Sequence, residues 1–104
     1  MKNKYITITG LRHYYGNGVF EIGDKVKCVK DRDNIYDAEA IEVKLPKFGR
    51  VGYVANSANT VKQGTMSAGR LYDKVGDTFY VKVMFVDGYS AIAKVKEKKK
   101  KDKR

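Results

Sequence analysis

The segment from Asp33 to Lys47 reads DNIYDAEAIEVKLPK, and GRVGYV follows at Gly49–Val54. Its first residues are of the types that form turns, because Asn and Asp side chains hydrogen-bond to the nearby backbone. Residues 40–45 then alternate apolar and polar side chains, which indicates a half-buried β-strand. Residues 50–54 are expected to form the next strand. The segment therefore predicts a turn that presents Tyr36 and Asp37 beside a pair of strands.

Four other stretches carry comparable strand patterns, rich in β-branched and aromatic residues. They are Tyr5–Leu11, Lys25–Lys30, Asp77–Val86 and Ser90–Lys96. In the longest of them, Phe79, Val81, Val83 and Phe85 are expected to share one face. The Asp87-Gly88 pair is a tight-turn signal, so the last two strands should form a hairpin.

The segment between the fourth and fifth strands has a different pattern. Residues 55–62 and 66–73 are each expected to form a short helix, the second with Ser67 as its N-cap. The resulting fold class is mainly β: a six-stranded OB-like or SH3-like β-barrel with one or two short helices between strands four and five. Closure into a barrel removes exposed strand edges. We expect the barrel to occupy residues 1–95.

The charge of the chain is strongly positive and unevenly spread. The formal net charge is +10, and the last nine residues, KEKKKKDKR, carry +5 of it. Such a run repels itself and has no apolar face, so residues 96–104 are predicted to be a basic disordered tail. The tail either keeps the protein soluble or contacts phosphates without sequence preference. The remaining excess of positive charge favours an anionic partner.

The length of the chain, its apolar segments and its cysteine content narrow the class of protein. A chain of 104 residues fits one domain with a single modest core. No apolar run approaches the roughly 20 residues that cross a bilayer. The start of the chain, with Lys2 and Lys4, lacks an apolar signal segment, and we expect a cytoplasmic protein with no membrane partner. The single cysteine, Cys28, cannot form an internal disulfide and is expected to be inert packing.

Two sequence blocks resemble the HIRAN domain family, small β-barrel modules found alone and attached to DNA helicases and remodelling ATPases. The first is Gly10–Gly16, GLRHYYG. The second combines NIYD at Asn34–Asp37 with EAI at Glu39–Ile41 and VGY at Val51–Tyr53. The chain departs from the family pattern at His13 and Tyr53. The resemblance implies a non-catalytic module that binds the 3′ end of single-stranded DNA.

The resemblance also implies roles for individual residues. Tyr36 would stack on the terminal base, Asp37 would accept the 3′-hydroxyl, Arg12 would pair with a phosphate, and Tyr14 would supply a second ring. The complete set of nucleic-acid-binding candidates is Arg12, His13, Tyr14, Tyr15, Tyr36, Asp37, Tyr53 and Asn56. A carboxylate should prefer a free hydroxyl and repel a 3′-phosphate. Base stacking contributes about 1–3 kcal/mol and tolerates any sequence.

Other interpretations of the same residues remain open. Tyr36 and Asp37 would also suit a turn with no ligand. The barrel groove would equally suit a protein partner, such as a helicase or a nuclease. A metal-dependent nuclease is a third interpretation, with Asp31, Asp33, Asp37 and Glu39 as the candidate ligands. One His and one Cys cannot build a four-ligand zinc site of these residue types, and we expect no cofactor.

Overall fold

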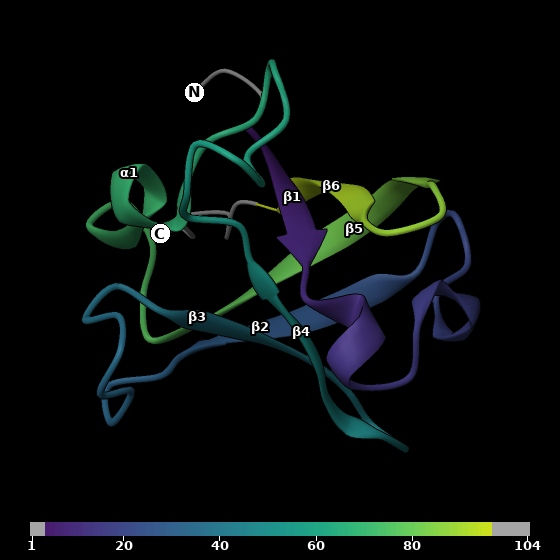
Figure 1. The fold of residues 1–104 in the computed structure, drawn as a ribbon, viewed down its shortest axis with the longest axis horizontal. Helices are drawn as coiled ribbons and strands as arrows, with labels where there is room; N and C mark the ends of the chain where they lie inside the picture. Colours follow the sequence, from purple (N-terminus) through teal and green to yellow (C-terminus); the bar gives the residue numbers. More distant parts are fainter. Residues whose placement is uncertain (1–3, 97–104) are drawn as a thin grey trace, which may run out of the picture.

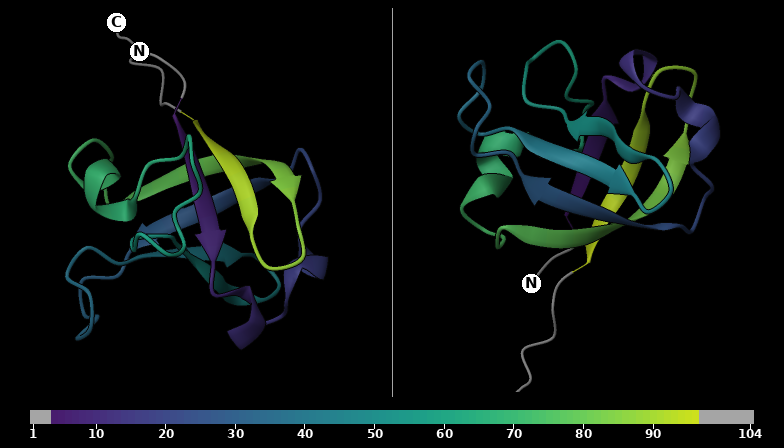
Figure 2. Two further views of the ribbon diagram at one scale, coloured as in Figure 1. Left: turned by 45° about the horizontal axis from the view of Figure 1, so that its top comes forward. Right: turned by 90° about the horizontal axis from the view of Figure 1, so that it is seen from below.

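The computed structural model describes residues 4–96 and shows a closed ring of six antiparallel strands (Figures 1 and 2). The strands are β1 (Tyr5–Thr9), β2 (Lys25–Lys30), β3 (Ile41–Leu45), β4 (Gly49–Val54), β5 (Thr78–Val86) and β6 (Ala91–Lys96). Their order around the ring is β1-β4-β3-β2-β5-β6, with β6 pairing back to β1. The mainly β, six-stranded barrel predicted from the sequence is therefore confirmed, including the β5–β6 hairpin.

The core fills the interior of this ring. Alternate residues of the strands point inward, and Ile6, Ile8, Val26, Val43 and Val81 are fully buried there. Burying each such side chain contributes about 1.5–3 kcal/mol relative to leaving it exposed. Cys28 belongs to the same cluster, and its burial raises the pKa of the thiol. The thiolate is therefore disfavoured, in agreement with a packing role.

Two β-bulges interrupt the alternation along the strands. Between β3 and β4 the pairing moves from Val43–Gly52 to Lys44–Arg50, which leaves Val51 as an extra residue in β4. Between β5 and β6 it moves from Val83–Ala93 to Phe85–Ile92, with Met84 extra. The prediction that Phe85 faces inward with Val83 is wrong, because the second bulge leaves Phe85 64% exposed.

The segment after β4 differs from its prediction in part. Residues 55–62 form turns and bends where a helix was expected, because backbone N–H groups at both ends of this stretch bond to β1. Ala55 N donates to Thr7 O at 2.8 Å, and Met66 N donates to Tyr5 O at 2.7 Å. The second expected helix exists as α1 (Ala68–Tyr72), and the Ser67 side chain caps it by accepting from Arg70 N.

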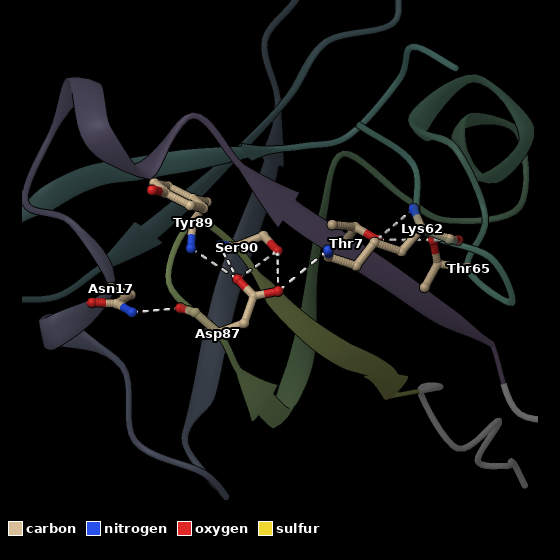
Figure 3. A network of polar contacts seen from close by, with 7 residues as sticks. All are labelled: Thr7, Asn17, Lys62, Thr65, Asp87, Tyr89 and Ser90. Atoms are coloured by element: carbon tan, nitrogen blue, oxygen red, sulfur yellow. Dashed lines mark hydrogen bonds and ion pairs between the residues drawn. The ribbon is translucent and has the colours of Figure 1, made fainter. Parts of the chain in front are cut away.

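Polar contacts attach this segment to β1 and to the β5–β6 hairpin (Figure 3). Thr7 Oγ1 accepts from Lys62 N at 3.2 Å and shares a hydrogen bond with Thr65 Oγ1 at 2.9 Å. Lys62 Nζ pairs with Asp87 at 3.2 Å. Thr7 points away from the barrel core and is nevertheless fully buried, because the segment covers it.

The loop after β1 contains two short 3₁₀ helices, η1 (Leu11–His13) and η2 (Asn17–Val19), and begins at Gly10 with φ 78°. It packs closely on β4 at Gly52, where a Cβ atom would lie 2.8 Å from both Leu11 Cδ2 and Thr9 O. Only glycine fits this position.

At the other end of the chain, Lys96 lies in β6 and pairs with Tyr80. The rest of the predicted tail, residues 97–104, lies outside the described residues, and its disorder stays a prediction. Within residues 4–96, no helix is long and apolar enough to span a membrane.

Candidate nucleic-acid interface

The loop between β2 and β3 is shaped by Asn34. Its side-chain oxygen accepts hydrogen bonds from Tyr36 N and Asp37 N, each at 2.9 Å, which is an Asx turn. Asp37 Oδ1 in turn accepts from Glu39 N at 2.9 Å. The turn leaves the Tyr36 side chain 91% exposed. The turn residues of the sequence therefore explain the placement of both side chains: the exposed Tyr36 ring lies next to the oriented Asp37 carboxylate.

Asn56 connects this loop to the segment that follows β4. Its Nδ2 lies 3.1 and 3.3 Å from the two carboxylate oxygens of Asp37 and 3.4 Å from Glu39 Oε1. Its Oδ1 accepts from Gly69 N at 2.8 Å. Figure 1 shows the β2–β3 loop and α1 on the same side of the barrel. Asn56, a candidate from the sequence, therefore contacts Asp37 directly.

Tyr53 continues the arrangement along the outside of β4. Its hydroxyl donates to Asp31 Oδ2 at 3.0 Å, and Asp31 also accepts from Asn34 Nδ2 at 3.3 Å. Burial of the phenol, with this hydrogen bond, raises the pKa of Tyr53 to about 12. Tyr53 is therefore a neutral donor at any physiological pH, and it is held to the base of the loop that carries Asp37.

Arg50 occupies the junction between the two sequence blocks. Its guanidinium lies 5.3 Å from the Tyr53 ring centroid, and its Nε donates to Glu42 Oε1 at 3.1 Å. Hydrogen bonds to Tyr14 and then to Glu42 raise the pKa of Arg50. Tyr14 of the first block therefore lies close to Arg50 in β4.

The remaining residues of the first block lie around η1. The Arg12 guanidinium stacks 4.9 Å from the Tyr89 ring centroid, on the β5–β6 hairpin. Tyr15 is exposed and contacts Phe48, with ring centroids 4.9 Å apart. His13 is exposed. Arg12 is thus directed toward a different neighbour from Tyr14, although the two are close in sequence.

Six side chains follow one another along the outside of the barrel, and we call them the polar strip: Asn56, Asp37, Asp31, Tyr53, Arg50 and Tyr14. Asn34 joins Asp37 to Asp31. The structure therefore brings Tyr14, Asp37, Tyr53 and Asn56 together and leaves Tyr36 at the exposed tip of the same loop. Arg12, His13 and Tyr15 flank the strip and are not bonded to it.

The sequence did not indicate four residues that contact the candidates or one another beside them: Arg50, Glu42, Phe48 and Tyr89. Arg50 and Tyr53 are three positions apart, so a regular strand would place them on opposite faces. The extra residue Val51 turns both to the outside. A single sequence contains no clear signal for a bulge, although the glycine at position 52 is a weak indication.

Three of the four carboxylates considered as metal ligands have other contacts. Asp31 accepts from Tyr53 and Asn34, whereas Asp37 and Glu39 accept from Asn56. Within residues 4–96, no group of three or more His, Cys, Asp or Glu side chains is placed to hold a metal ion.

The fold and the polar strip define a small closed β-barrel whose outer strand face and adjoining loops carry aromatic and hydrogen-bonding side chains. Residues 2–88 match the family model of the HIRAN domain, and the chain belongs to this family. The membership supports a nucleic-acid-binding module.

Two solved structures share the fold. One is the crystal structure of the HIRAN domain of human HLTF, with a TM-score of 0.65 and 21% identity over 89% of this chain and 72% of that one. The other is the crystal structure of a protein from Lactobacillus plantarum, with a TM-score of 0.61 and 17% identity over 90% and 93%. A search of curated proteins found no match.

Proposed function

We propose that this protein is a non-catalytic module that binds the 3′ end of single-stranded DNA at the polar strip. The observation that carries the proposal is the pairing of the exposed Tyr36 ring with the Asp37 carboxylate, which Asn56 orients. A ring at this position can stack on a terminal base of any identity. The neighbouring carboxylate is an acceptor for a free hydroxyl, which an internal nucleotide lacks.

Charge supports the selection of an end with a hydroxyl. Asp37 and Glu39 both approach Asn56, so a 3′-phosphate would meet negative charge there. Arg50 and Arg12 supply positive charge at the other end of the strip and at its flank, where the phosphates of the preceding nucleotides would bind. The strip would therefore read the end of the strand and not its sequence.

The test is fluorescence anisotropy of labelled single strands over a salt series. The strands end in a 3′-hydroxyl, a 3′-phosphate or a chemically blocked 3′ end. Asp37→Asn keeps the side-chain shape and removes the charge, and Asp33→Asn is the matched control in the same loop. The native chain should prefer the hydroxyl by about tenfold or more, because a hydrogen bond to a charged group contributes about 1.5–3 kcal/mol. Asp37→Asn should lose this preference and Asp33→Asn should keep it.

An unchanged preference in Asp37→Asn would remove the assigned role. Incubation with Mg²⁺ or Mn²⁺ should leave the labelled strand intact, and cleavage would contradict the non-catalytic assignment.

One observation favours a second candidate, a protein-interaction module. Ile35 stands next to Tyr36 at the loop tip and is 85% exposed, and an apolar side chain there suits a protein groove. This candidate predicts DNA binding that is indifferent to the strand end and disappears when the chain is cut after Lys96. The cut follows Lys96 because this residue still pairs in β6.

A further inference from the structure

A second charged surface lies on β2, β5 and β6. The strand registers align its side chains in two rows that cross the three strands. The first row is Lys25, Lys82 and Lys94, and the second is Lys27, Tyr80 and Lys96. Neighbouring strands lie about 4.8 Å apart, so each row forms a compact line of side chains. We call these six residues the lysine face.

The charges of the lysine face are not compensated by carboxylates. Within residues 4–96, none of its five lysines forms an ion pair, whereas Lys44 approaches Glu42 and Lys62 pairs with Asp87. Lys82 stands directly between Lys25 and Lys94 in the ladder. Like charges directly opposite one another destabilise a sheet, so this arrangement has a cost that no carboxylate in the described residues offsets.

The lysine face and the polar strip lie on opposite walls of the barrel. In the ring β1-β4-β3-β2-β5-β6, β5 is three strands from β4 in either direction (Figure 2). A terminal nucleotide on β4 therefore cannot also occupy β5. Any ligand of the lysine face is a separate segment of polymer or a separate molecule.

We propose that the lysine face binds the phosphate backbone of nucleic acid without requiring a strand end. Lysine ammonium groups are point charges that bind phosphates without sequence information. The face is less suited to a lipid surface, because membrane-surface elements combine basic side chains with bulky apolar ones. Tyr80 is the one aromatic residue in the two rows, and the Lys25 ammonium already covers its ring at 4.7 Å from the centroid.

The experiment measures binding of the full chain to a circular single-stranded oligonucleotide, which has no 3′ end. The test variant is the double substitution Lys82→Gln with Lys94→Gln. The control, with the same loss of charge, is Lys47→Gln with Lys74→Gln, both exposed and neither part of the two rows. The slope of log K against log salt should fall by about 1.4 in the test variant, since each single-strand phosphate contact contributes about 0.7. The control should keep the native slope.

Equal changes in the two variants would overturn the proposal, because net charge alone would then explain the affinity. Stronger loss of binding to phosphatidylserine vesicles than to the circular strand would assign the face to a membrane and overturn it as well. Failure of the proposed 3′-end site can be distinguished from failure of the lysine face, because Asp37→Asn should not alter binding to a strand without ends. Thermal melting shows that both variants fold, and the test variant should melt at an equal or higher temperature.

Discussion

Asn56 contacts the Asp37 carboxylate through one nitrogen, 3.1 Å from one oxygen and 3.3 Å from the other. The opposite end of the same amide accepts from Gly69 N at 2.8 Å. Because a carboxylate accepts and a backbone N–H donates, the amide has only one orientation that satisfies both partners. The position of Asp37 is thus coupled to α1, which is far from it in sequence.

Replacing Asn56 with Ala should reduce discrimination between a 3′-hydroxyl and a 3′-phosphate while leaving binding to a circular strand unchanged. The carboxylate loses the donor that orients it, and the charge of the protein is not altered. Anisotropy with the three linear ends and the circle measures both quantities. Asn59→Ala, in an exposed turn nearby, is the control. Equal discrimination in both variants would show that Asn56 does not position Asp37.

The Tyr53 hydroxyl should contribute to stability through its bond to Asp31. Tyr53→Phe keeps the ring beside Arg50 and removes a 3.0 Å hydrogen bond to a carboxylate. The free energy of unfolding in urea should fall by about 1.5–3 kcal/mol. Tyr36→Phe removes a hydroxyl from a fully exposed ring and should change it by less than about 0.5 kcal/mol. An equal loss of unfolding free energy in Tyr53→Phe and Tyr36→Phe would contradict a stabilising role of the Tyr53 hydroxyl.

Gly52 should not tolerate a methyl group. In Gly52→Ala the added Cβ meets Leu11 Cδ2 and Thr9 O at 2.8 Å, so β4 must move away from β1 and η1. We expect a loss of about 1–3 kcal/mol, measured by chemical denaturation. Gly88→Ala is the matched control, because no atom lies within 4 Å of its added Cβ. If Gly52→Ala is as stable as Gly88→Ala, the packing described here is wrong.

Asp87 should make stability depend on pH under acid conditions. Hydrogen bonds from Tyr89 N and Ser90 N, with the ion pair to Lys62, lower the pKa of Asp87 from 3.8 to about 2. A lowered pKa gives stability that is complete above the unfolded value and is lost as pH falls through the folded value. Native protein should therefore lose stability between pH 4 and 2 more steeply than Asp87→Asn. Parallel curves of unfolding free energy against pH, measured in urea, would contradict this.

The sequence was sufficient for the barrel, the hairpin and the Ser67-capped helix, because these depend on alternation, turn residues and capping, which are local. The helix expected at residues 55–62 was wrong for a tertiary reason. The backbone N–H groups of Ala55 and Lys62 bond to Thr7 in β1, a residue whose outward position gave no sign of burial.

For the site, the sequence was sufficient to propose Asp37, Tyr36 and Asn56, and the structure joins Asp37 to Asn56 directly. It was insufficient for Arg50, whose outward position depends on the Val51 bulge, and for the separation of Arg12 from Tyr14. The ligand roles of all eight candidates stay predictions. The lysine face could not be predicted without the strand registers, because its residues come from three strands.

The bulge at Val51 determines which side chains of β4 face outward. If all residues of β4 paired regularly with β3, without the bulge, positions 50 and 53 would lie on opposite faces, and either Arg50 would turn toward the core or Tyr53 would turn away from Asp31. Point substitutions on the outside of this strand can change the ligand preference of the polar strip in small steps. A substitution that abolishes the bulge would separate Arg50 from Tyr53 in one step, so the two halves of the polar strip stay together only while the bulge is kept.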